Sequence, residues 1–102
     1  MFDVRNCVKT RYFEVKLYDE NQKGVVFHVE PPKVKTLKKM ITISNKKDLN
    51  AEEFRFVVCS MLEKNKENIR VERYVSELTI DQLKQVFTAF MEWLNESKQE
   101  KN

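Results

Sequence analysis

The sequence predicts an α+β fold in which an N-terminal antiparallel β-hairpin precedes three main helices, the last of which packs centrally. Three observations predict this class. Apolar and polar residues alternate along 11–30, which is the period of strands with one buried face. Apolar residues then recur every three or four positions in 34–43, 51–64 and 79–96, which is the period of amphipathic helices.

The hairpin is predicted from two alternating arms and the polar link between them. The apolar positions of the arms are Phe13, Val15, Leu17, Val25, Phe27 and Val29. The link, 19–24, ends in Gly24, which can adopt positive φ. Pro31 and Pro32 should end the second arm, because proline cannot donate to a strand ladder.

Two helices should follow the prolines, over 34–43 and over 51–64. Asn50 is expected to cap the second of these helices, and Glu52 and Glu53 complement its positive N-terminal end. The next segment, 69–78, combines strand alternation with helical spacing. We predict that it enters as a strand and continues as one helical turn.

The last helix is the clearest element, because Thr79 and Gln82 form a capping box at its start. It should cover 79–96. Its predicted inward stripe is Ile80, Leu83, Phe87, Phe90, Met91 and Leu94, widened by Val86 and Trp93. We therefore assign residues 1–96 to a single α+β domain and 97–102 to a polar tail that frays.

The composition indicates a small globular protein with a charged surface. The 102 residues are 41% hydrophobic and 34% charged, and the net charge is +3. No apolar run approaches the ~20 residues that a membrane-spanning helix needs, and residues 1–5 show no apolar signal core. We therefore expect a cytoplasmic protein. Cys7 and Cys59 form no CxxC motif, and Cys59 is expected to be a buried reduced thiol.

Residues that could carry catalysis are sparse. His28 is the only histidine, and Glu30, two positions along the same strand face, could pair with it. Such a pair is more often a surface contact than a catalytic dyad, which also needs a nucleophile. Gly24 is the only glycine, so no phosphate-binding glycine loop exists. The sequence predicts a non-enzymatic protein without metal or cofactor.

The lysine segment, residues 33–47, contains no acidic residue. Its lysines are Lys33, Lys35, Lys38, Lys39, Lys46 and Lys47. Clustered lysines can contact phosphates, but no aromatic platform interleaves these. The pattern therefore favours a solvated face, with a nucleic-acid site or the charged rim of a protein interface as alternatives.

Partner binding is expected at residues that the core stripes leave over. Phe56, Val86 and Trp93 fall outside the central stripes, and aromatic residues of this kind anchor protein interfaces or self-association. Lys35, Lys38 and Lys39 could rim such a surface, with Val34 and Leu37 beneath them. The candidate partner-binding residues are Lys35, Lys38, Lys39, Phe56 and Trp93.

Two segments carry a resemblance to a known family. Residues 25–39 read VVFHVEPPKVKTLKK, and the last helix opens as LTIDQL at 78–83 and closes as FMEWLNE at 90–96. These strings resemble the strand, the Pro-Pro-Lys turn with its Leu-Lys-Lys helix, and the aromatic-rich closing helix of tail assembly chaperones from long-tailed phages and prophages of Gram-positive bacteria. The resemblance covers residues 11–96.

The resemblance implies a chaperone without an active site in the cytoplasm of the bacterial host. Such chaperones bind the long helical tape measure protein, keep it soluble and recruit tail tube subunits around it. Many of them also have a longer product made by ribosomal frameshifting, and the polar end at 97–102 would suit the shorter product. The alternative is a small nucleic-acid-binding or regulatory protein of a mobile element that uses the lysine segment.

Overall fold

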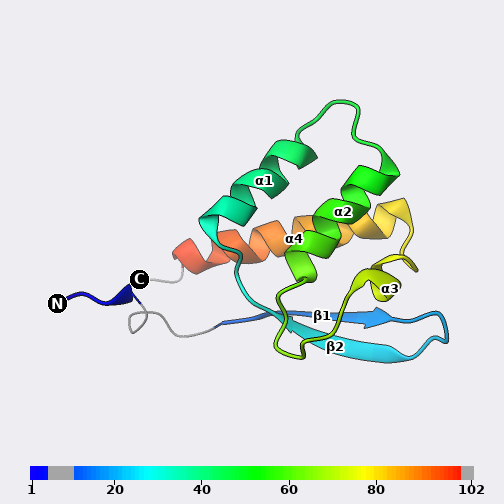
Figure 1. Ribbon diagram of the computed structural model, residues 1–102, viewed down its shortest axis with the longest axis horizontal. Coiled ribbons are helices and arrows are strands. Elements are labelled where there is room, and N and C mark those ends of the chain that lie inside the picture. Colours follow the sequence, from blue (N-terminus) through cyan, green and yellow to red (C-terminus); the bar gives the residue numbers. More distant parts are fainter. Residues whose placement is uncertain (5–10, 100–102) are drawn as a thin grey trace.

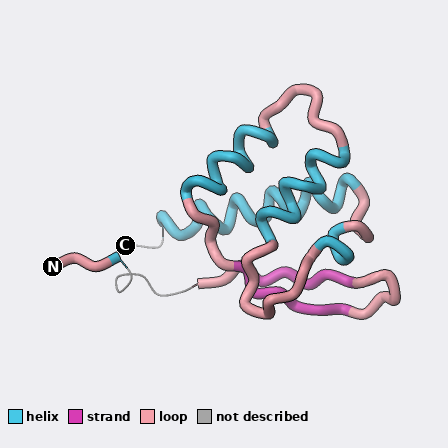
Figure 2. Tube along the Cα trace, viewed as in Figure 1, coloured by secondary structure: helices cyan, strands magenta, loops and turns pink. Residues whose placement is uncertain are grey.

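The computed structural model describes residues 1–4 and 11–99, and it confirms the α+β class. Cys7 and residues 100–102 lie outside this description. The elements, in chain order, are β1 (Phe13–Tyr18), β2 (Gly24–Val29), α1 (Val34–Ser44), α2 (Ala51–Leu62), α3 (Glu72–Val75) and α4 (Ile80–Gln99). Figure 1 shows α1, α2 and α4 on one side of the hairpin, with α3 close to its turn. The strands form the lower edge of the same view in Figure 2.

The hairpin has the predicted antiparallel register, from Phe13 opposite Val29 to Tyr18 opposite Gly24. Its inward face is buried, with Phe27 and Val29 fully inaccessible to solvent. In the turn, the Asp19 carboxylate accepts hydrogen bonds from the backbone N–H groups of Asn21 (2.8 Å) and Lys23 (2.9 Å). These bonds hold the backbone of the turn in one conformation. Because the turn joins the two strands, they also fix the register of the strands.

Gly24, which can adopt positive φ, does not do so in the turn. Gln22 takes that conformation, with φ 66°, and Gly24 begins β2. A Cβ atom on Gly24 would lie 2.7 Å from Lys16 Cε and 2.9 Å from Tyr18 Cε2. The glycine therefore makes room for neighbouring side chains on β1.

Helices α2 and α4 both begin with capping boxes. Asn50 Oδ1 accepts from the Glu53 N–H (2.8 Å), while the Asn50 N–H donates to Glu53 Oε1 (3.2 Å), which confirms the predicted cap of α2. Thr79 and Gln82 make the equivalent pair of bonds at the start of α4. None of the described helices is long and apolar enough to span a bilayer.

The segment before α3 differs from the prediction. No strand enters at Ile69; instead Val29 bridges to Asn65, and α3 supplies the predicted helical turn. The reason is the side chain of Asn65, which is 5% exposed. Its Nδ2 donates to the carbonyls of Leu62 (3.0 Å) and Ile69 (2.9 Å), and its Oδ1 accepts from the Ile69 N–H (3.0 Å). These bonds close a loop in which Ile69 has no free backbone group to offer a strand.

Helix α4 packs centrally, between the α1–α2 pair and the hairpin (Figure 1). Phe90 is fully buried and meets Phe13 of β1 edge-to-face, with ring centroids 5.2 Å apart. Ile80 was predicted to belong to the inward stripe, but it lines an open cavity beside α2 and α3 and stays 41% exposed. The helix continues to Gln99, three residues past its predicted end at Glu96.

Candidate protein-interaction surface

The most prominent exposed aromatic residue of the helices is Phe56 on α2. Helical spacing points Phe54, Val57 and Val58 into the core, where each is at most 6% exposed, whereas Phe56 is 61% exposed. Covering a side chain of this size typically contributes about 1.5–3 kcal/mol. A binding partner that covered the Phe56 ring would therefore gain a large apolar contribution to the free energy of binding.

A cavity of about 270 Å³ lies beside Phe56. It is lined by Arg55, Phe56, Cys59, Ser60, Glu63 and Glu72. Arg55 is held over it by Glu52 (2.9 Å) and by Glu72 of α3 (3.4 Å). Burial raises the pKa of the Cys59 thiol, which is half-buried, so this thiol is a poor nucleophile at neutral pH.

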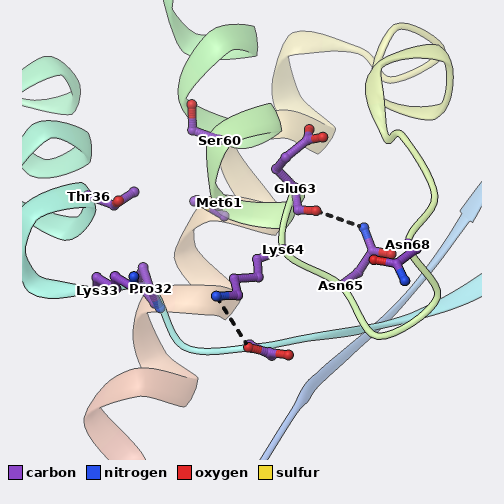
Figure 3. A pocket seen from close by; sticks show the side chains of 10 residues that line it. Pro32, Lys33, Thr36, Ser60, Met61, Glu63, Lys64, Asn65 and Asn68 are labelled. Atoms are coloured by element: carbon purple, nitrogen blue, oxygen red, sulfur yellow. Dashed lines mark hydrogen bonds and ion pairs between the residues drawn. The ribbon is translucent and has the colours of Figure 1, made fainter.

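A second cavity, of about 430 Å³, opens between the start of α1 and the end of α2. Figure 3 shows Thr36 on α1 across from Ser60 and Met61 on α2, with an ion pair between Lys64 and Glu30 at the rim. Because both cavities are lined by Ser60 and Glu63, they adjoin each other. We call Phe56, Cys59, Ser60 and Glu63, with the two cavities, the α2 surface.

The structure does not bring the candidate lysines to the α2 surface. Lys35, Lys38 and Lys39 are exposed on the side of α1 opposite the buried Met40, and they line neither cavity. None of the three forms an ion pair with another described residue. Val34, expected beneath the lysines, is instead 72% exposed.

Trp93, the other candidate aromatic residue, packs against the hairpin. Its ring lies 5.7 Å from the Phe13 ring and 5.5 Å from the Phe90 ring, measured between centroids. The Arg11 guanidinium covers it at 4.0 Å, a cation–π contact. Trp93 therefore completes the core and is not adjacent to Phe56.

Glu30, which could have paired with His28, is not its partner. His28 Nδ1 lies 2.5 Å from Glu67 Oε2, and Nε2 lies 3.6 Å from Glu14 Oε2, while Glu30 faces Lys64. The cause is the loop after α2, which runs beside β2 and lets Glu67 also accept the His28 backbone N–H (2.9 Å). Burial raises the pKa of Glu67, but the hydrogen bonds from His28 outweigh it and hold this pKa below its usual value.

Sequence reasoning found Phe56 but missed both cavities, since the walls of each combine residues from different elements. The only local signal was a pair of small or polar positions, Thr36 and Ser60, next to apolar stripes. Among the described residues, no three His, Cys, Asp or Glu side chains are arranged to hold a metal ion. No family model, curated protein or solved structure gives a significant match to the chain.

Proposed function

We propose that the protein is a non-enzymatic tail assembly chaperone that works in the bacterial cytoplasm. Its client would be the tape measure protein, a long helix, which it keeps soluble and presents to tail tube subunits. The observation that carries the proposal is the exposed Phe56, which lines one open cavity of the α2 surface, next to a second cavity that adjoins the first. The resemblance of residues 25–39 and 90–96 supplies the identity of the client.

An exposed ring at the edge of a row of two adjoining cavities suits a helical client. An amphipathic helix presents apolar side chains every three or four residues, and these bind best where a ridge and a groove alternate. Phe56 would enter the space between two such side chains, and the cavity beside it and the adjoining one would receive apolar side chains of the client. The ion pairs of Arg55 and Lys64 form a polar rim around this contact, as in interfaces with a dry centre.

Co-expression with an apolar helical segment of a tape measure protein tests the proposal. We expect Phe56→Ser to leave most of the client in the insoluble fraction, while the wild type keeps it in solution. The matched control is Val26→Ser, which removes a 43% exposed apolar side chain from the hairpin. If Phe56→Ser is folded and still keeps the client soluble, the α2 surface is not the binding site.

The second candidate function is nucleic-acid binding through the lysine segment. The observation that favours it is the exposure of Lys35, Lys38 and Lys39 on one side of α1. Binding of this kind weakens steeply with salt because it releases counterions. If Lys35→Glu with Lys38→Glu abolishes DNA binding at physiological salt, and Lys23→Glu with Lys84→Glu does not, this function replaces the chaperone proposal.

A further inference from the structure

The free edge of β1 is a second interaction feature, separate from the α2 surface. The His28 N–H donates to Glu67 and the His28 carbonyl accepts from the Lys66 N–H (2.8 Å), so His28 directs its backbone away from β1. Along each strand of an antiparallel pair, the backbone N–H and C=O groups of successive residues point alternately toward and away from the partner strand. Two residues that lie opposite each other point these groups in the same sense, both toward or both away from the other strand. Glu14, which lies opposite His28, therefore directs its N–H and C=O groups away from β2, as do Lys16 and Tyr18.

These outward groups of β1 have no partner among the described residues. The corresponding edge of β2 is partly covered by the loop after α2, through the bonds of His28 and of Glu30 to Lys64 (3.0 Å). An uncovered strand edge is a template for pairing with another strand, and proteins commonly block such edges with proline, bulges or covering loops. Within residues 1–4 and 11–99, no proline, bulge or covering loop blocks β1, whose six residues are FEVKLY in a regular register.

A groove runs along the same edge, between β1 and α4. It has a volume of about 450 Å³. The residues that line it are Phe13, Glu14, Val15, Lys16, Leu17, Leu78, Gln82, Gln85, Val86 and Ala89. Figure 1 shows β1 and α4 running in opposite directions, so the groove follows the length of the strand. A strand added to β1 would lay its inward side chains along this groove.

We propose that the strand which pairs with this edge is β1 of a second copy of the chain. Antiparallel pairing of β1 with itself joins the two hairpins into a four-stranded sheet about a twofold axis. The residues with outward backbone groups must then pair among themselves. In one such register, Glu14 lies opposite Lys16 of the copy, and symmetry repeats this contact. Opposite charges on facing positions stabilise a strand pair.

The same register favours the pairing along the rest of the strand. Tyr12 falls opposite Tyr18 of the copy, and Val15 lies on the axis opposite its own equivalent, facing the groove. The next permitted register would place Lys16 opposite Lys16, and like charges on facing positions repel. On the α4 side of the groove, the short side chain of Ala89 leaves room for the added strand.

Charge reversal tests both the occupant and the register. By light scattering after size exclusion at low salt, the wild type should show twice the chain mass of 12.3 kDa. Lys16→Glu and Glu14→Lys should each be monomeric alone, because like charges then face each other. Mixed together, they should form a heterodimer, and the double variant carrying both changes should be a dimer again. Only a twofold pair with Glu14 opposite Lys16 behaves in this way.

Two further variants keep the outcome decisive. Lys16→Pro removes an outward N–H without breaking a bond to β2, so it should be folded by circular dichroism and monomeric. Lys23→Glu, in the turn, makes the same charge change as Lys16→Glu away from the edge and should be dimeric. Three results would each overturn the proposal: a monomeric wild type, a dimeric Lys16→Pro, or a double variant that stays monomeric. A monomeric wild type is also the result expected if β1 binds a strand of another protein instead.

Discussion

Trp93 and Phe56 were both predicted from the sequence to bind a partner, but in the structure Trp93 is packed against other residues and Phe56 is exposed. Both lie beside the apolar stripe of a helix, yet Trp93 is enclosed by Phe13, Phe90 and Arg11, whereas Phe56 is 61% exposed. The region of α4 and the hairpin therefore uses its extra aromatic residue for packing, and α2 leaves its own uncovered. Helical periodicity shows which side chains leave a stripe, but not whether a distant segment covers them.

The largest expected effect lies in the packed region. Phe90→Ala should lower the free energy of unfolding by about 3–5 kcal/mol, because Phe90 is fully buried and its removal leaves a cavity among α4, α2 and β1. Urea denaturation followed by circular dichroism measures this loss. A loss below that of an exposed substitution would mean that α4 does not pack centrally.

Trp93→Ala sharpens the comparison at the residue predicted to bind a partner. We expect a loss of about 2 kcal/mol, less than a fully buried tryptophan would give, because the ring is half-buried against Phe13 and Phe90. Arg11→Gln, which removes only the cation–π contact, should cost about 0.5–1 kcal/mol. If Trp93→Ala is as stable as the wild type, the ring does not contribute to the core.

The elements with strong local signals could be predicted from sequence. The alternating arms, the caps at Asn50 and Thr79 and the long apolar stripe of α4 each contain their own structural information. The failures lie where one polar side chain binds the backbone of its own loop, which apolar periodicity does not show. The positive φ at Gln22 follows from the Asp19 turn, and the missing strand at Ile69 follows from the hydrogen bonds of Asn65.

The candidate site was predicted only in part, because it joins residues from separate elements. Phe56 could be found because its position outside the apolar stripe follows from its neighbours on one helix. The cavities could not, since each joins residues from different elements, as Thr36 and Ser60 do. Nor could the partner of His28, because Glu67 reaches it through a loop whose path depends on Asn65.

Glu67→Gln tests the hairpin contact through its pH dependence. The hydrogen bonds from His28 lower the pKa of Glu67 in the folded protein. The stabilisation they give is therefore complete above the ordinary pKa of 4.5 and is lost as the pH falls through the lower folded value. We expect Glu67→Gln to cost about 1 kcal/mol near neutral pH and progressively less in acid. A difference from wild type that stays constant down to acid pH would contradict this assignment.

The smallest expected effect on stability is that of Phe56→Ser, and it is the one that defines the α2 surface. Because the ring is mostly exposed and serine has a similar helix propensity, the free energy of unfolding should change by less than about 0.5 kcal/mol. Phe54→Ser, two residues earlier and 6% exposed, is the matched control and should be strongly destabilised. If Phe56→Ser also lost several kcal/mol, its ring would belong to the fold, and the contrast with Trp93 would disappear. A stable variant that no longer binds the helical client would instead show that this ring serves a contact outside the chain.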